Sequence, residues 1–433
     1  MAKIDYRLPI LCYHAVIRRL SAFFLLLFLT QFSTAQVRDI KSEEDYQKYL
    51  EEIRLKKQAE ATERIKGYEN QHKDSIRELN FAYSLLSEIP EWVYECDSVE
   101  KIDISHTAIT RIPKKLNRMP NLRALLVEEM QHPEQLRFQK IKNLEVITLT
   151  KNQLTKAPRG LARAKNIQEL YLNYNAFERL PTRLGRIKHL HTLNMDFNPL
   201  LIHDQKFFRL RKLQKLTLNR CHLTAVPTHL PQLKQLETLQ MAGNSLKGLP
   251  EWFSVLNKLE NIILYENQIQ EIPTVLYAMP QLKTLDLYHN QIKKVGPELA
   301  QLKNIETLYL SYNELYSLPE NLGEMQSLKH LYLHHNKLSY LPASLSQLYQ
   351  LETLHLNTNR FESFPNQVLD LQNLVDFDIS NNSIADFPQE IATLPHLEVI
   401  SLHSNPASKK EPNPSYAALI EALEKVQGRT ILP

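Results

Sequence analysis

The stretch KHLYLHHNKLSYLP at residues 329–342 places ring-bearing side chains between leucines. Tyr332, His334 and His335 stand where a soluble protein usually has small or charged residues. Alternate residues of a strand point to opposite faces, so Tyr332 and His334 are predicted to leave the core on the same side. Tyrosine offers a large contact area with a polar tip, and histidine can exchange a proton or bind a metal ion.

Comparable residues recur at intervals of 23 residues toward both ends of the chain, so a structure repeating with that period would bring them together. Tyrosine is enriched where proteins bind proteins, and Asp286 and Asp378 would orient a partner among the rings. We therefore predict a partner-binding surface, here called the aromatic patch. Its members are Tyr265, Asp286, Tyr288, His289, Tyr309, Tyr312, His330, Tyr332, His334, His335, His355 and Asp378.

Other uses of these residue types stay open. The rings could simply follow the preference of aromatic side chains for strands. His334, His355 and Asp378 have donor types suited to zinc or copper, so a metal, carbohydrate or other small ligand is the alternative occupant of the patch. We nevertheless predict no metal site, because side chains on an open curved sheet diverge.

Catalysis is not expected. His355, Asp378 and Ser380 could be drawn as a hydrolytic arrangement, but no strained turn presents the serine and no oxyanion donors are evident. The chain has only 8 glycines, whereas phosphate-binding loops depend on glycine. We therefore predict no catalytic residues, no cofactor and no enzyme activity.

The residues of the aromatic patch must be positioned by a short repeat in the sequence. The template L-x-x-L-x-L-x-x-N-x-L-x-x-L-P fits fifteen times, with every step 23 residues long except the 22 residues between Leu122 and Leu144. The first positions are Ile76, Val99, Leu122, Leu144, Ile167, Leu190, Leu213, Leu236, Leu259, Leu282, Ile305, Leu328, Leu351, Leu374 and Leu397.

Each position of the template has a physical role. Positions 4 and 6 share the core face of a short strand, while positions 3, 5 and 7 point to the opposite face and position 8 lies at its rim. Asparagine at position 9 can satisfy backbone groups that a turn leaves unpaired, so stacked repeats would form a ladder of amides. The proline after position 14 suits the first turn of a short helix. Stacked neighbours bury the apolar face that a single repeat cannot.

With these positions the chain resembles the leucine-rich repeat family, in its type with L-P and about 23 residues per repeat. The resemblance covers residues 76–405. It implies an α/β fold: a leucine-rich-repeat solenoid, or horseshoe, with a concave parallel β-sheet, about 15 repeats and helical caps. It also implies protein binding on the concave face, without fixing one chemistry. We therefore expect a non-enzymatic recognition scaffold with a protein or peptide partner, and a monomer.

Four repeats depart from the template. The repeat at Leu213 has Cys221 in the amide position, Gly296 precedes the proline in the repeat at Leu282, and two repeats are more irregular. The repeat at Leu122 has Met130 in the amide position and lacks the L-P step, which is also missing from the repeat at Leu190. Either the outer side has drifted locally, or these two irregular loops form a second contact site.

Both ends of the sheet need covers. Helical spacing of apolar residues predicts a cap within residues 406–433. A charged helix is predicted over residues 40–75, and one helical stripe could cover the first repeat. That stripe is formed by Tyr46, Tyr49, Leu50 and Ile53.

Residues 1–35 are predicted to be a secretory signal peptide. Arg18 and Arg19 precede an apolar run that is too short to span a bilayer, and small residues allow cleavage after Ala35. A buried or signal-anchor helix is the alternative, and the true start codon stays open. The protein is then secreted, periplasmic or on the cell surface, or cytoplasmic if the hydrophobic N-terminus is not a signal.

The net charge, the hydrophobic segments and the cysteines limit the kinds of partner and fold that we expect. The formal net charge is +4, of which residues 1–35 carry +3, so the rest is near neutral and no nucleic acid partner is expected. After residue 36 the sequence has no second hydrophobic segment, so we expect no integral membrane span. The two later cysteines do not suggest a disulfide scaffold. The predicted organisation is residues 1–35 signal peptide, 36–75 charged helical N-terminal segment, 76–405 leucine-rich repeat domain and 406–433 C-terminal helical cap.

Overall fold

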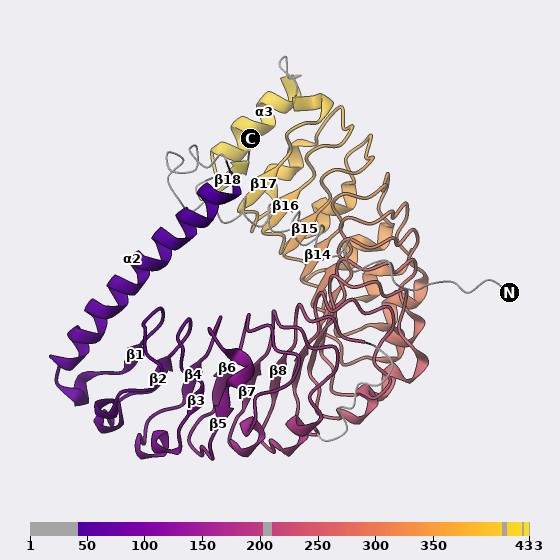
Figure 1. Ribbon diagram of the computed structural model, residues 1–433. Helices are drawn as coiled ribbons and strands as arrows, with labels where there is room; N and C mark the ends of the chain where they lie inside the picture. Colours follow the sequence, from indigo (N-terminus) through magenta and orange to yellow (C-terminus); the bar gives the residue numbers. More distant parts are fainter. Residues whose placement is uncertain (1–41, 202–209, 409–413, 427, 433) are drawn as a thin grey trace. The chain divides into compact units, whose positions relative to one another are not determined.

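The computed structural model describes residues 42–201, 210–408, 414–426 and 428–432, in two compact units, Met1–Lys66 and Gly67–Pro433 (Figure 1). The predicted signal peptide lies outside the described residues. The helix α2 begins at Glu43 in the first unit and ends at Glu69, three residues into the second. Ser42 caps it, because its Oγ accepts a hydrogen bond from the Asp45 N–H at 3.0 Å. The proposed cover of the first repeat by this helix stays a prediction.

Residues 67–433 form an open parallel sheet of 16 strands, and in Figure 1 the strands follow one side of the array. Fifteen strands occupy positions 3 to 5 of the fifteen predicted repeats, so the prediction of a leucine-rich-repeat solenoid is confirmed. The strands are β1 (Glu78–Asn80), β2 (Lys101–Asp103), β4 (Ala124–Leu126), β6 (Val146–Thr148), β7 (Glu169–Tyr171), β8 (Thr192–Asn194), β9 (Lys215–Thr217), β10 (Thr238–Gln240), β11 (Asn261–Ile263), β12 (Thr284–Asp286), β13 (Thr307–Tyr309), β14 (His330–Tyr332), β15 (Thr353–His355), β16 (Asp376–Asp378), β17 (Val399–Ser401) and the terminal β18 (Thr430–Leu432).

The register explains the periodic burial. Successive strands pair at equal repeat positions, as Tyr309 does with Tyr332 and Tyr332 with His355. The side chains at positions 4 and 6 both point to the core. Leu354 and Leu356, for example, are fully buried. Each such leucine contributes about 1.5–3 kcal/mol when it leaves water. The opposite side of the sheet, formed by positions 3, 5 and 7, is here called the open face.

Where the structure describes the segment after the strand, short 3-10 helices follow on the other side of the repeats. Proline stands just before eight of them, as the N-cap residue, rather than in the first turn as predicted. The Pro342 carbonyl, for example, accepts the Leu345 N–H at 3.1 Å. The 3-10 helices are Lys73–Ser75, Glu91–Glu95, Lys114–Arg118, Pro133–Gln135, Leu161–Arg163, Thr182–Arg186, Leu230–Gln232, Glu251–Val255, Thr274–Ala278, Pro297–Gln301, Leu322–Glu324, Ala343–Gln347, Asn366–Asp370, Gln389–Thr393 and Pro406–Ser408.

The predicted amide ladder is present. Asn336 Nδ2 donates to the Leu333 carbonyl of its own repeat at 2.9 Å and to the Leu310 carbonyl of the preceding repeat at 3.0 Å. Its Oδ1 accepts the Leu315 N–H at 3.0 Å. One buried side chain therefore satisfies three backbone groups and joins two repeats. Where Cys221 replaces the amide, its thiol donates to the Met195 carbonyl at 3.2 Å.

The irregular repeat at Leu122 builds an extra element instead of the L-P step. The strand β5 (Arg137–Phe138) pairs in parallel with β3 (Arg111–Ile112), and Arg137 also bridges to Arg159. This small second sheet was not predicted. In the other irregular repeat, residues 202–209 lie outside the described part of the chain.

The C-terminal cap contains a helix and a strand. The predicted helix is α3 (Pro414–Glu424), but β18 then pairs with β17 and ends the sheet. Arg429 secures this return, because its guanidinium donates to the carbonyls of Leu397 at 2.8 Å, Ala392 at 2.7 Å and Leu394. A planar group with several N–H donors suits the unpaired carbonyls at the end of the last repeat.

At the other end of the sheet, Tyr68 contacts the first repeat. Its ring meets Phe81 edge-on at 6.5 Å, and its hydroxyl accepts the Asn80 N–H at 3.2 Å. Within the described residues, no helix is long and apolar enough to cross a membrane. Cys96 and Cys221 are buried free thiols.

Candidate functional site

The structure places the aromatic patch on the open face and rim of the sheet. Its members lie on strands β11 to β16 and in the turns that follow them. Most are half-buried, while His289 is exposed and Tyr312 is 37% exposed. The rings therefore stand outside the core, as the repeat positions predicted.

The rings form one continuous network across repeats. Tyr309 and Tyr332 stack with centroids 4.6 Å apart and an interplanar angle of 6°, and Tyr332 meets His355 edge-on at 5.1 Å. His334 lies 6.2 Å from His355 and 5.6 Å from Tyr312, which links this group to the rim. The connected rings are Tyr265, Tyr288, His289, Tyr309, Tyr312, Tyr332, His334, His335 and His355.

Position 8 owes its orientation to the backbone. In all fifteen repeats the residue at this position has a positive φ, and in fourteen of them it is not glycine. This left-handed conformation turns the chain out of the strand and aligns equal side chains of neighbouring repeats. Tyr312 and His335 consequently stack at 3.9 Å, as do Tyr174 and Phe197 at 4.2 Å and Tyr83 and His106 at 3.9 Å.

The histidines of the patch are held by hydrogen bonds. His334 Nδ1 lies 2.8 Å from Ser311 Oγ, and His355 Nε2 lies 3.0 Å from Asp376 Oδ2. Burial, together with the neighbouring His355 and His335, lowers the pKa of His334 from 6.5 to about 4. Burial also lowers the pKa of His335. His334 therefore takes up a proton only at a lower pH than a free imidazole does.

The two orienting aspartates also have roles in their own turns. Asp286 Oδ1 accepts the Tyr288 N–H at 3.0 Å, and burial raises the pKa of Asp286 to about 6. Asp378 Oδ1 accepts the Ser380 N–H at 2.9 Å and the Ser380 hydroxyl at 2.7 Å. His330 lies at the edge of the patch, 3.1 Å from Thr353 Oγ1.

These contacts bear on the alternative chemistries. Ser380 donates to Asp378 while His355 is turned to Asp376, so the three groups do not form a nucleophile–base–acid arrangement. Among the residues that the structure describes, no group of three or more His, Cys, Asp or Glu side chains is arranged to hold a metal ion.

Apart from histidine, the charged residues on the open face and rim of the repeats that form the patch are all acidic. From Leu259 to Leu374, six repeats contribute positions 3, 5, 7 and 8, and none of these residues is lysine or arginine. Four are acidic: Glu266, Asp286, Asp376 and Asp378. The face combines aromatic rings with carboxylates, an environment that attracts cationic groups.

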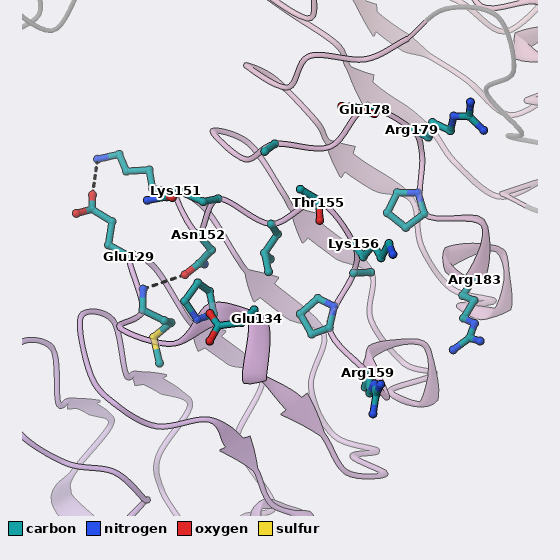
Figure 2. A pocket seen from close by; sticks show the side chains of 18 of the residues that line it. Glu129, Glu134, Lys151, Asn152, Thr155, Lys156, Arg159, Glu178, Arg179 and Arg183 are labelled. Atoms are coloured by element: carbon teal, nitrogen blue, oxygen red, sulfur yellow. Dashed lines mark hydrogen bonds and ion pairs between the residues drawn. The ribbon is translucent and has the colours of Figure 1, made fainter. Parts of the chain in front are cut away.

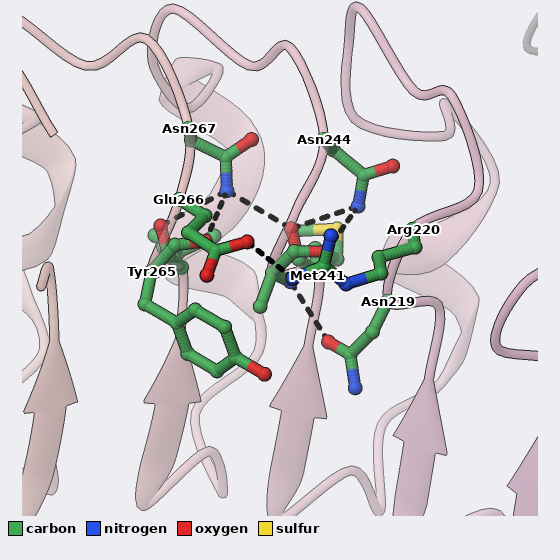
Figure 3. Close-up of polar contacts among 9 residues, drawn as sticks. Asn219, Arg220, Met241, Asn244, Tyr265, Glu266 and Asn267 are labelled. Atoms are coloured by element: carbon green, nitrogen blue, oxygen red, sulfur yellow. Dashed lines mark hydrogen bonds and ion pairs between the residues drawn. The ribbon is translucent and has the colours of Figure 1, made fainter. Parts of the chain in front are cut away.

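At the end of the aromatic patch nearer the N-terminus, an ion pair spans the rim of the sheet. Arg220 donates to Glu266 two repeats away, and Figure 3 shows its side chain reaching across toward Glu266 and Tyr265. The repeat between them has Gly243 at position 8, where an added Cβ would lie 2.6 Å from Arg220 Cγ. The absence of a side chain at Gly243 therefore leaves room for the side chain of Arg220. Arg220 also lies over the Phe197 ring, 5.8 Å from its centroid.

A separate groove lies beside the irregular repeat. Its volume is about 1500 Å³, and Figure 2 shows side chains of both charges around it. Lys151 pairs with Glu129 at 3.2 Å, and the Met130 N–H donates to Asn152 Oδ1 at 2.9 Å. The departure from the template thus produces a distinct surface, apart from the aromatic patch.

The comparisons with known proteins agree with this architecture. The family model described as leucine rich repeat matches residues 211–269, 258–315, 280–338, 303–361 and 349–406. The chain belongs to the leucine-rich repeat superfamily. A leucine-rich repeat protein of Leptospira interrogans is 25% identical with a TM-score of 0.65, and the match covers 85% of this chain and 98% of that one.

Two further structures share the fold at lower identity. The plant peptide hormone receptor RGFR1 in complex with RGF2 is 22% identical, with a TM-score of 0.50, and the match covers 76% of this chain and 57% of the receptor chain. The Toll–Spatzle complex of Drosophila is 18% identical, with a TM-score of 0.55, and the match covers 74% of this chain and 49% of that one. No curated protein matches the sequence.

Sequence reasoning missed three parts of the site. Asp376, which holds His355, stands at position 3 of the next repeat, so the template could have placed it beside that histidine. The Arg220–Glu266 bridge was missed because its partners are 46 residues apart. The stacking at position 8 depends on the left-handed turn, which the side-chain pattern does not reveal.

Proposed function

We propose that this protein is a non-enzymatic scaffold that binds a protein or peptide through the aromatic patch. The supporting observation is the continuous network of nine rings on the open face, where the repeats leave side chains accessible. Stacked rings lose little further freedom on binding, so their contact area contributes to affinity at a small entropic cost.

The chemistry of the patch indicates what the partner presents. Carboxylates among electron-rich rings, without lysine or arginine at the same positions, favour a partner segment with Lys or Arg side chains. Cation–π contacts contribute about 0.5–1 kcal/mol each at exposed sites and about 2 kcal/mol when they are desolvated. Asp376 is held by His355, so Asp286 and Asp378 are the carboxylates proposed to orient the partner's cations.

A matched pair of variants tests this proposal. Tyr309→Ala with Tyr332→Ala removes the stacked pair, whereas Tyr316→Ala with Tyr340→Ala removes two tyrosines that are 51% and 50% exposed outside the patch. Affinity capture from culture fluid, followed by mass spectrometry, should lose a partner with the first pair and keep it with the second. Equal capture by both double variants would refute binding at the patch.

Localisation belongs to the same proposal. We infer that the chain is exported with cleavage after Ala35, which leaves the charged segment 36–75 ahead of the repeats. N-terminal sequencing of the exported protein checks this: a mature chain that begins at Gln36 supports it, and an intact chain retained in the cytoplasm contradicts it.

A further inference from the structure

The second sheet of the irregular repeat aligns three arginines. Arg111 on β3 pairs in register with Arg137 on β5, and Arg137 bridges in parallel to Arg159 of the next repeat. The backbone holds this register: the Arg137 N–H donates to the Thr110 carbonyl, and the Phe138 N–H donates to the Arg159 carbonyl, both at 2.8 Å. Adjacent strands lie about 4.8 Å apart, so three guanidinium groups start from neighbouring backbone sites.

A second row of cations runs beside the first. Lys114, Lys140 and Arg163 stand three or four residues after the three arginines, one in each repeat. All six side chains line a depression of about 680 Å³ on the outer side of the repeats. Its remaining lining is Thr110, Gln135, Phe138, Gln139 and Gly160, so no carboxylate belongs to it.

These cations lack intramolecular counterions. Throughout the described ranges, none of the six takes part in an ion pair, although lysines such as Lys115 and Lys151 elsewhere on the same repeats do. Like charges directly opposite each other on adjacent strands are destabilising. The local sequence is also strongly basic: residues 111–188 hold seventeen Lys and Arg but six Asp and Glu. An anionic ligand would offset the repulsion that the register creates.

Gly160 allows Arg159, the third arginine, to lie beside the other two. Its φ is +87°, and an added Cβ would lie 1.9 Å from the Phe138 carbonyl oxygen. Only glycine combines this conformation with so close an approach of two backbones. The glycine at position 160 therefore allows Arg159 to lie beside Arg137.

We propose that this depression, here called the cation array, binds a linear glycan that carries sulfate or phosphate groups. Guanidinium groups bind such oxyanions with two parallel hydrogen bonds, and rows along neighbouring repeats suit a chain with regularly spaced charges. The hydroxyl of Thr110 and the amides of Gln135 and Gln139 suit sugar hydroxyl groups. Single-stranded nucleic acid fits less well, because its bases stack on exposed aromatic rings and the one ring in the lining, Phe138, is 3% exposed.

The experiment uses the full chain, a heparin-derived octasaccharide and isothermal titration calorimetry over a range of salt concentrations. The site variant carries Arg111→Gln, Arg137→Gln and Arg159→Gln. The control carries Arg118→Gln, Lys165→Gln and Arg186→Gln, which remove the same charge from exposed positions outside the depression. The site variant should lose at least about tenfold in affinity and flatten the salt dependence, because fewer counterions are released, while the control stays within about threefold.

Several results would overturn the proposal. They are equal losses in the two triple variants, no binding by the wild type at physiological salt, or tighter binding of polyglutamate or an oligothymidylate of matched charge. Circular dichroism of both variants shows whether the repeats remain folded. If the site variant unfolds, Arg111→Lys with Arg137→Lys and Arg159→Lys keeps the charge and should bind more weakly than wild type by losing the paired hydrogen bonds; unchanged affinity would refute arginine recognition. Tyr309→Ala with Tyr332→Ala should leave this binding unchanged, which separates it from the proposed function of the aromatic patch.

Discussion

Replacing Asn336 by alanine tests how the amide ladder supports the aromatic patch. The change removes the donor to the Leu310 and Leu333 carbonyls and the acceptor of the Leu315 N–H, in a turn where Asn336 is 9% exposed. A satisfied hydrogen bond contributes about 1 kcal/mol, and a buried group left without a partner costs about 1–3 kcal/mol. Three lost partners therefore predict a decrease of about 3–6 kcal/mol in the free energy of unfolding.

Two further variants sharpen this prediction. Asn336→Cys should lose less than the alanine variant, because Cys221 shows that a thiol can keep one carbonyl satisfied. Asn304→Ala is the matched control, since its amide makes one exposed bond to the Pro280 carbonyl at 2.8 Å, and it should cost about 1 kcal/mol or less.

Urea unfolding followed by circular dichroism and tyrosine fluorescence measures these differences. Long repeat arrays can lose two-state behaviour, so hydrogen exchange at the Leu315 amide provides a local measure of the same bond. Exchange there should accelerate in both Asn336 variants. A loss below about 1 kcal/mol for Asn336→Ala, or the same loss for Asn304→Ala, would show that the ladder does not join the repeats as described.

Three further predictions concern charge, backbone and assembly. Because the pKa of His334 is lowered to about 4 and that of Asp286 is raised to about 6, acidification from about pH 6.5 to 4 destabilises the native state through His334 and stabilises it through Asp286. Urea midpoints should therefore fall more steeply with acid in Asp286→Asn than in wild type, and less steeply in His334→Gln; identical slopes would refute these shifts. Gly243→Ala should cost about 1–2 kcal/mol through its left-handed backbone, with φ at +61°, and more through its clash with Arg220. Arg220→Ala in the same chain should restore the part that the clash causes; additive losses would contradict the clash. Light scattering should find the monomer that we predict, and a stable dimer would contradict it.

Much of the fold follows from the sequence because its repeat is regular. A leucine at positions 4 and 6 and an asparagine at position 9 recur often enough to fix the strand register, and the strands lie where the template placed them. The open-face location of Tyr309, Tyr332 and His355 follows from the alternation of strand residues. Their partner role stays a prediction, because position alone does not define a ligand.

The parts that could not be predicted depend on backbone geometry and distant contacts. Arg429 reaches carbonyls 32 to 37 residues earlier, and β18 adds a strand where helical spacing suggested only a helix. The near-neutral charge of residues 36–433 concealed the basic surface at residues 111–188, because an average cannot show how charges are distributed. The lowered pKa of His334 arises from burial, which ring chemistry alone does not reveal.

The most direct test of the central claim is the affinity of the captured partner for four purified proteins, measured by biolayer interferometry. These are the wild type, Tyr309→Ala with Tyr332→Ala, Tyr316→Ala with Tyr340→Ala, and Asp378→Asn. We predict that the first tyrosine pair weakens binding by at least about 2 kcal/mol, that the second has no effect, and that Asp378→Asn reduces the dependence of affinity on salt. Equal affinity of the wild type and the Tyr309/Tyr332 variant would contradict recognition through the aromatic patch.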